Sequence, residues 1–347
     1  MAKLLFIDSF DHYSTSQTSR KWTTQNGSTI TSAGRTGNGM IGGALDFPTK
    51  TLDADYTTLT MGTAYRTQSF GNAILYFRNV INDVQFSLHH VGDGRLQFRF
   101  QALGGSPISA LSPPSSYVMN TDRWYYFEMQ ATINGGPPAH VVASARVNGV
   151  EFLTWDYTHP SLGAAGMAFR YVTMQAPGGG LTATYDDLYV TDTEFLGDVR
   201  IGVLYPNAVG DSSQWTPNGA GANYTKVMEH PADDNTTYVA AASTGLKDLY
   251  NLDDIDPAFA GVIKGVQALW CVIKSDEGAA AVKGVWKSSG TEIVQSSGFN
   301  YLPPNGYYPS ATSYLYNIQT ERKSLFTAAD WTKTEINALQ LGITRTL

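Results

Sequence analysis

The chain has one cysteine, few charged residues and no long hydrophobic run. Cys271 is the only thiol among 347 residues, so neither an intrachain disulfide nor a cysteine metal site can form. No segment approaches the roughly 18 apolar residues of a membrane-spanning helix, so we expect no membrane insertion. The opening MAKLLFIDSF has one lysine and no long apolar core, so we expect no signal peptide and synthesis in the cytoplasm.

Charge is scarce and its balance is acidic. Only 15 % of the residues are charged, against about 25 % in an average globular protein, and the net charge is −7. Nucleic-acid binding requires clustered lysine and arginine to neutralise phosphates, so we expect no nucleic-acid partner. Glycine, serine, threonine, asparagine and tyrosine replace the charged residues, as many short strands and tight turns require.

The first part of the chain alternates apolar and polar residues with a period of two. In VQFSLHH, Val84, Phe86 and Leu88 share one face, and RLQFRF repeats the pattern after a glycine-rich turn. A second hairpin is predicted at Asn148-Gly149, the strongest short turn signal. The sequence therefore predicts an all-β protein whose residues 1–192 form an antiparallel sandwich of the jelly-roll kind.

The segment TYDDLYVTDTEFLGDVRIGVLYP, residues 184–206, reads as a domain boundary. A strand that ends near Val190 is followed by a mostly polar link at 193–198 and a second strand with Val199, Ile201 and Val203 on one face. We therefore predict a second, smaller β-sandwich over 199–347.

Within this second domain, the runs 263–275 and 280–290 predict a longer pair of strands around Asp276-Glu277-Gly278. A short C-terminal helix is predicted over 333–341. Thr332 and Glu335 have capping-box spacing, and Gly342 is interpreted as the stop.

Several fragments resemble known modules. GMIGGALDF, RWYYFEM, ARVNGVEF and YDDLYV occur in an order that resembles the concanavalin A-like, laminin-G-like jelly rolls, and LLFIDSFDHY resembles the start of such modules in tailed-phage virion proteins. FLGDVRIGVLYPNAVG, DDNTTYV, DLYNLDDI and WTKTEINALQLGI are similar to the C-terminal module of those proteins. The resemblance implies a bacteriophage virion structural protein, without indicating whether it lies on the capsid or the tail.

The same superfamily contains glycosidases, whose retaining members need two carboxylates about 5–5.5 Å apart. No Glu-x-Asp-x-x-Glu-like run occurs; Glu128 and Glu151 stand alone. Asp186 and Asp187 are adjacent, so on a regular strand they point to opposite faces. We therefore expect no catalytic residues and a protein that is not an enzyme.

The acidic pair has two interpretations. Asp186 and Asp187 are weak candidates for a metal site, with calcium as the only cofactor considered, but a calcium ion takes six or more oxygens and no ligand-rich loop lies nearby. A carboxylate that caps backbone N–H groups near a strand end is the favoured alternative. His89 and the adjacent His90 diverge on a strand, so they cannot share one metal ion.

Two surfaces are candidates for binding. A polar face could bind a glycan or be the hydrated side of an ordinary sheet; its residues are Ser87, His89, Arg95, Gln97 and Arg99. The loop 300–316 is rich in tyrosine and low in charge, which suits either packing on its own domain or an assembly contact through Tyr301, Tyr307 and Tyr308.

Together these observations predict a non-enzymatic virion protein, a decoration or fibre component, that acts through assembly with other virion proteins and surface display. A homo-oligomer is expected. The alternative is a lectin-like protein that binds a host-surface glycan during adsorption.

Overall fold

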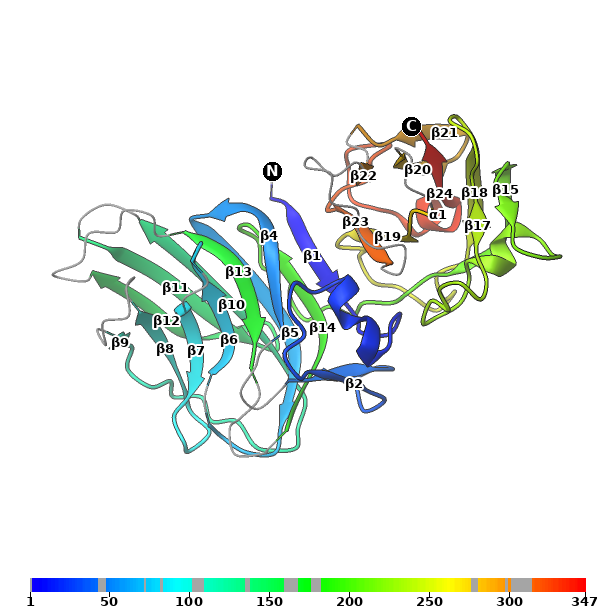
Figure 1. The fold of residues 1–347 in the computed structure, drawn as a ribbon. Helices are drawn as coiled ribbons and strands as arrows, with labels where there is room; N and C mark the ends of the chain where they lie inside the picture. Colours follow the sequence, from blue (N-terminus) through cyan, green and yellow to red (C-terminus); the bar gives the residue numbers. More distant parts are fainter. Residues whose placement is uncertain are drawn as a thin grey trace. The chain divides into compact units, whose positions relative to one another are not determined.

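The computed structural model describes residues 2–42, 48–71, 73–81, 84–101, 109–134, 138–158, 168–175, 182–275, 280–296, 299–300 and 314–347. The prediction of an all-β antiparallel fold is confirmed. The chain divides into two compact units, Met1–Ile201 and Gly202–Leu347 (Figure 1).

The first unit is a sandwich of two antiparallel sheets. Sheet A has eight strands in the order β12-β11-β10-β5-β14-β3-β2, with β1 paired to β14. A 3-10 helix, η1 (Thr15–Arg20), follows β1. The strands of sheet A are β1 (Leu4–Asp8), β2 (Thr29–Thr31), β3 (Gly39–Ile41), β5 (Thr58–Thr67), β10 (Tyr125–Asn134), β11 (His140–Val147), β12 (Val150–Thr158) and β14 (Ala183–Thr191).

Sheet B has six strands in the order β4-β13-β6-β7-β8-β9 and carries the candidate site. The two central hairpin strands β7 and β8 alternate as the sequence predicts, because Phe86, Leu88, Leu96 and Phe98 are fully buried against sheet A. The strands are β4 (Thr49–Tyr56), β6 (Ala73–Arg78), β7 (Val84–His90), β8 (Leu96–Gln101), β9 (Ser109–Leu111) and β13 (Phe169–Met174).

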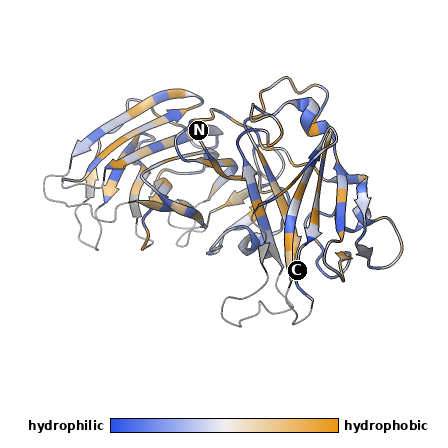
Figure 2. Ribbon diagram, turned by 90° about the horizontal axis from the view of Figure 1, so that it is seen from above, coloured by the Kyte–Doolittle hydropathy of each residue, from blue (hydrophilic) through white to orange (hydrophobic). Residues whose placement is uncertain are grey.

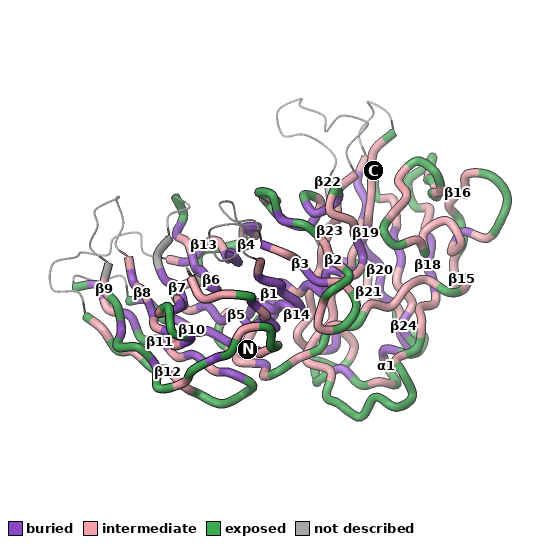
Figure 3. The backbone as a smooth tube through the Cα atoms, turned by 90° about the horizontal axis from the view of Figure 1, so that it is seen from below, coloured by how far each residue is buried: buried purple, intermediate pink, exposed green. Residues whose placement is uncertain are grey.

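Hydrophobic and hydrophilic positions alternate along the strands (Figure 2). Burial is greatest in the central strands of sheet A: every residue of β14 is buried, whereas the edge strand β12 is largely exposed (Figure 3). The hairpin between β11 and β12 turns at Asn148 and Gly149, both with positive φ, as the Asn-Gly signal predicts.

The second unit is built on a sheet in the order β15-β18-β24-β20-β21, with β22 paired to β20. A small sheet of β19 and β23 packs on it through Trp270 and Trp286, whose ring centroids lie 6.3 Å apart. The elements are β15 (Pro206–Ser213), β16 (Thr216–Pro217), η2 (Asn223–Lys226), β17 (Val239–Ala240), β18 (Lys247–Leu252), β19 (Val266–Val272), β20 (Ala281–Ser288), β21 (Thr291–Val294), β22 (Phe299–Asn300), β23 (Leu315–Glu321), α1 (Lys333–Asn337) and β24 (Leu339–Arg345).

Three predictions about these elements were wrong. No strand covers 199–203, and the first strand of the second unit begins at Pro206. The runs 263–275 and 280–290 contain strands, but β19 pairs with β23 and β20 pairs with β24. The helix is capped by Thr332 and Glu335 as predicted, yet it ends at Asn337 instead of 341.

Gly342 lies within β24 and does not stop the helix. Its backbone closely approaches the carbonyl of Asp248 on β18, where any Cβ would collide. The glycine is therefore required by strand packing, a requirement that the sequence pattern does not distinguish from a helix stop.

Candidate functional site

A row of side chains crosses the outer face of sheet B, the face turned away from the core. Each member is the register partner of the next on the neighbouring strand. With strands about 4.8 Å apart, six strands span about 24 Å. The row consists of Thr49, Thr173, Tyr76, Ser87, Arg99 and Leu111.

His89 lies beside this row and contacts two of its members. Its Nε2 is 2.7 Å from Ser87 Oγ, and its ring meets the Tyr76 ring edge to face with centroids 5.8 Å apart. Burial, together with the positive charges of Arg99 and His90, lowers the pKa of His89 to about 4. His89 is therefore a neutral hydrogen-bonding group at neutral pH, and it is half-buried rather than freely solvated.

Four of the five predicted glycan-face residues meet on β7 and β8. Ser87 is paired in register with Arg99, and His89 is paired with Gln97. Arg95 lies outside this group: it precedes β8, and its Nε donates to Asp93 at 2.7 Å. His90 points the other way, into the core, where its Nε2 is 3.1 Å from the Tyr65 hydroxyl.

Three residues of the face were missed by the sequence reasoning. Tyr76 comes from β6, the hairpin partner of β7. Thr173 and Thr49 come from β13 and β4, which join β6 through long-range pairing that local alternation does not reveal. For Tyr76 and Thr173 the only signal was polar spacing within LYFR and YVTM. Tyr76, Ser87 and the two threonines are buried. The part-exposed groups of this face are the His89 imidazole, the Gln97 amide and the Arg99 guanidinium, which can donate to and accept from a polar ligand.

The acidic pair lies elsewhere, on β14 of sheet A, and does not alternate as a regular strand would. The register jumps between Asp186 and Tyr189, and Asp187 has φ 50°. This bulge brings both carboxylates into one fully buried network instead of sending them to opposite faces. The prediction of opposite faces was therefore wrong.

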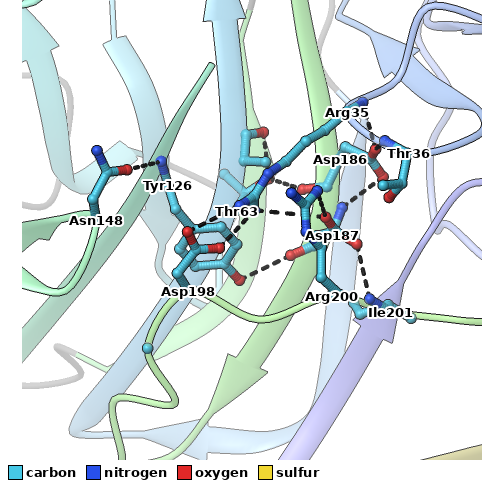
Figure 4. A network of polar contacts seen from close by, with 12 residues as sticks. Arg35, Thr36, Thr63, Tyr126, Asn148, Asp186, Asp187, Asp198, Arg200 and Ile201 are labelled. Carbon is cyan, nitrogen blue, oxygen red and sulfur yellow. Dashed lines mark hydrogen bonds and ion pairs between the residues drawn. The ribbon is translucent and has the colours of Figure 1, made fainter. Parts of the chain in front are cut away.

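Both carboxylates are occupied by donors from the chain (Figure 4). Asp186 Oδ2 accepts the backbone N–H groups of Arg35 at 2.7 Å and Thr36 at 3.0 Å, and Asp186 Oδ1 accepts that of Asp187 at 2.7 Å. Asp187 Oδ1 accepts the Ile201 N–H at 2.8 Å, and its Oδ2 is 3.3 Å from an Arg200 guanidinium nitrogen.

This arrangement fits the capping interpretation and does not fit calcium. Every carboxylate oxygen already accepts a hydrogen bond or faces a guanidinium, and the guanidinium of Arg35 also lies 3.7 Å from Asp187. A divalent cation would have to displace these donors and approach two arginines. Among the residues that the structure describes, no group of three or more histidine, cysteine, aspartate or glutamate side chains could hold a metal ion.

The same network fixes residues 193–201, which we call the strap, to sheet A. Glu128 Oε1 accepts the Gly197 N–H at 2.7 Å and the Tyr189 hydroxyl. Leu196 joins a small hydrophobic cluster with Tyr126 and Tyr189. Glu128 is thus a buried anchor for the strap, whereas Glu151 is exposed and accepts from Ser144 at 2.7 Å.

A shallow groove of about 230 Å³ lies over β10, β11 and β12 on sheet A. Its lining consists of Gln130, Thr132, Val142, Ala143, Ser144, Thr154, Trp155 and Asp156. The predicted assembly tyrosines, Tyr301, Tyr307 and Tyr308, lie outside the described residues. In the described part of the chain, no helix is long and apolar enough to cross a membrane.

Among known proteins, only solved structures are similar to this chain. No family model matches the chain, and no curated protein sequence does. An endo-β-1,4-glucuronan lyase from the fungus Trichoderma reesei has a TM-score of 0.37 and 10 % identity, over 56 % of this chain and 98 % of that one. Alginate lyase Aly36B has a TM-score of 0.38 and 14 % identity, over 58 % of this chain and 98 % of the lyase.

Domain 4 of AbnA, an extracellular arabinanase of Geobacillus stearothermophilus, was solved with arabinotriose. It has a TM-score of 0.35 and 13 % identity, over 55 % of this chain and 93 % of that one. Likeness at this level concerns the β-sandwich fold and assigns no ligand to this chain.

The expectation that the chain is not an enzyme is nevertheless corrected, since polysaccharide lyases are among the similar solved structures. The exclusion rested on the missing pair of carboxylates, which only glycoside hydrolysis of the two-carboxylate kind requires.

Proposed function

We propose that the first unit binds a glycan on the outer face of sheet B. The observation that supports this most is the continuous row of hydrogen-bonding side chains across the sheet, with His89 and Gln97 beside it. Sugar hydroxyls need closely spaced donors and acceptors, which His89, Gln97 and Arg99 offer on two paired strands. The members of the row on β4, β13, β6 and β7 are buried, so a bound glycan would contact this face through His89, Gln97 and Arg99, which are part-exposed.

The proposal extends to display on a virus particle, for which the support is the sequence resemblance of both halves to tailed-phage virion proteins. The glycan would then belong to the host surface, the second unit would attach to other virion proteins, and copies of the chain would form a homo-oligomer. Electron microscopy of purified particles with an antibody against the chain tests this extension. If the purified particles lack the protein, the extension to a virus particle is wrong, whereas the proposal of glycan binding is unaffected.

A glycan array probed with the full chain tests the binding site. We expect the double variant His89→Ala with Gln97→Ala to weaken binding about 10-fold or more, because two hydrogen bonds worth roughly 0.5–1.5 kcal/mol each are lost. The matched control is Ser144→Ala with Thr154→Ala, in the groove on sheet A, and it should bind as the natural chain does. A folded chain that binds no glycan, or binding lost only in the control, contradicts the proposal.

A further inference from the structure

The outer face of sheet B differs in charge from the rest of the molecule. The protein has a net charge of −7, yet β6, β7, β8 and β13 contain no aspartate or glutamate. Those four strands contain three arginines: Arg78, Arg99 and Arg170. Arg170 is paired with Asp55 of the neighbouring strand β4. We call the part of this face around Arg99 the patch.

Arg99 lies in the middle of the patch, and its charge lacks a counter-ion. Some other arginines of the first unit have one: Arg35 pairs with Asp198 at 2.6 Å, and Arg170 pairs with Asp55 at 3.3 Å. In the part of the chain that the structure describes, Arg99 has no ion pair, and its Nε is buried without a hydrogen-bond partner. Arg99 is itself part-exposed, so an anion from outside the chain can reach its guanidinium.

The neighbours of Arg99 leave the positive charge uncompensated. Ser87 is neutral, and His89, whose pKa is about 4, is neutral at neutral pH. The patch therefore offers one fixed guanidinium flanked by neutral hydrogen-bonding groups. A guanidinium matches a carboxylate or a sulfate ester in geometry, and the neutral groups suit the hydroxyls between such anions.

We propose that the ligand of this face is an acidic polysaccharide, a polyuronate or a sulfated glycan, with its anionic group bound by Arg99. The inference rests on the proposed glycan-binding function and specifies its ligand class. The part-exposed groups lie on the neighbouring strands β7 and β8, next to the exposed Leu111 on β9.

The test is calorimetric titration of the full chain with three oligosaccharide probes of equal length: a polyuronate, a sulfated galactan and a neutral glucan. We expect one of the acidic probes to bind and the neutral one not to bind. Arg99→Gln should weaken binding at least about 10-fold, as the loss of one charge-assisted hydrogen bond implies. Arg99→Lys should weaken it less, because the charge remains.

Arg95→Gln is the matched control. Arg95 also carries a guanidinium near β8 but is paired with Asp93 in the preceding turn, so binding should be unchanged. Thermal melts of each variant show that the chain is folded. Binding of the neutral glucan that is insensitive to Arg99→Gln overturns the inference and leaves the proposed function standing; the absence of any glycan binding by the folded chain overturns both.

Discussion

Asp187 determines the local architecture of β14 through one unusual backbone angle. Its φ of 50° lies in the left-handed region, which aspartate tolerates better than most residues. Its carbonyl accepts the Tyr126 hydroxyl at 2.9 Å, and the carbonyl of Asp186 accepts the Thr63 hydroxyl at 2.9 Å. The bulge is thus held by side chains from two adjacent strands, β10 and β5, and it aims both carboxylates at the strap and the 35–36 turn.

Protonation of Asp186 is linked to the stability of the first unit. Burial and the neighbouring charge of Asp187 raise the pKa of Asp186 from its ordinary 3.8 to about 7. The folded state therefore holds a proton that the unfolded state releases, so this contribution is present at low pH and is lost as pH rises through about 7. Asp186→Asn should consequently cost less stability at pH 8 than at pH 5.5.

Urea unfolding of both proteins at the two pH values measures this difference. Asp8 is the control site, because it is also fully buried but its pKa is lowered. The cost of Asp8→Asn should not shrink as pH rises. A cost of Asp186→Asn that stays constant from pH 5.5 to 8 would show that Asp186 is ionised throughout, contrary to this account.

At the scale of elements, the strap is part of the first unit and not a free link. Its backbone donates to Glu128 and Asp187, and the guanidinium of Arg146 lies 4.0 Å from the ring centroid of Phe195. Gly202 is the first residue of the second unit, and nothing lies within 4 Å of the position that a Cβ would take there. Any hinge between the units is therefore expected after Ile201, beyond the segment 193–198.

Removing the strap should destabilise the first unit. A chain of residues 1–201 retains it, whereas a chain of residues 1–192 loses the burial of Leu196 and leaves Glu128 and Asp187 without strap donors. The cost is roughly 3 kcal/mol or more, from one apolar side chain and at least one unsatisfied buried acceptor. Urea unfolding of the two chains measures it, and equal midpoints would show that the strap contributes nothing.

The sequence predicted those elements that depend on local chemistry. Period-two alternation identified the two faces of β7 and β8, Asn148-Gly149 identified a hairpin, and Thr332 with Glu335 identified the helix start. It could not predict the bulge at Asp187 or the packing requirement at Gly342, because both arise from contacts with distant strands.

The candidate site was predictable to the same extent. Alternation placed Ser87, His89, Gln97 and Arg99 on one face. It also included Arg95, which lies in the turn before β8 and donates to Asp93 instead. The two threonines depend on the strand order β4-β13-β6, which is fixed by long-range pairing. Local patterns thus identify a face, and only the topology completes it.

At the scale of the whole molecule, charge is distributed unevenly in a way that suits an anionic ligand. The net charge of −7 opposes the approach of a polyanion, while the central strands of sheet B contain arginine without carboxylates. Long-range repulsion between exposed charges is screened over about 8 Å at physiological ionic strength, so contact with the patch dominates at close range. An acidic glycan is then selected by the patch and not by the overall charge.

A structure of the full chain with a bound oligosaccharide tests the central claim most directly. The account predicts sugar density over β6, β7 and β8, with hydrogen bonds to Gln97 and an anionic group at Arg99. Density in the groove over β10, β11 and β12, or on the second unit, with the outer face of sheet B empty, would contradict it.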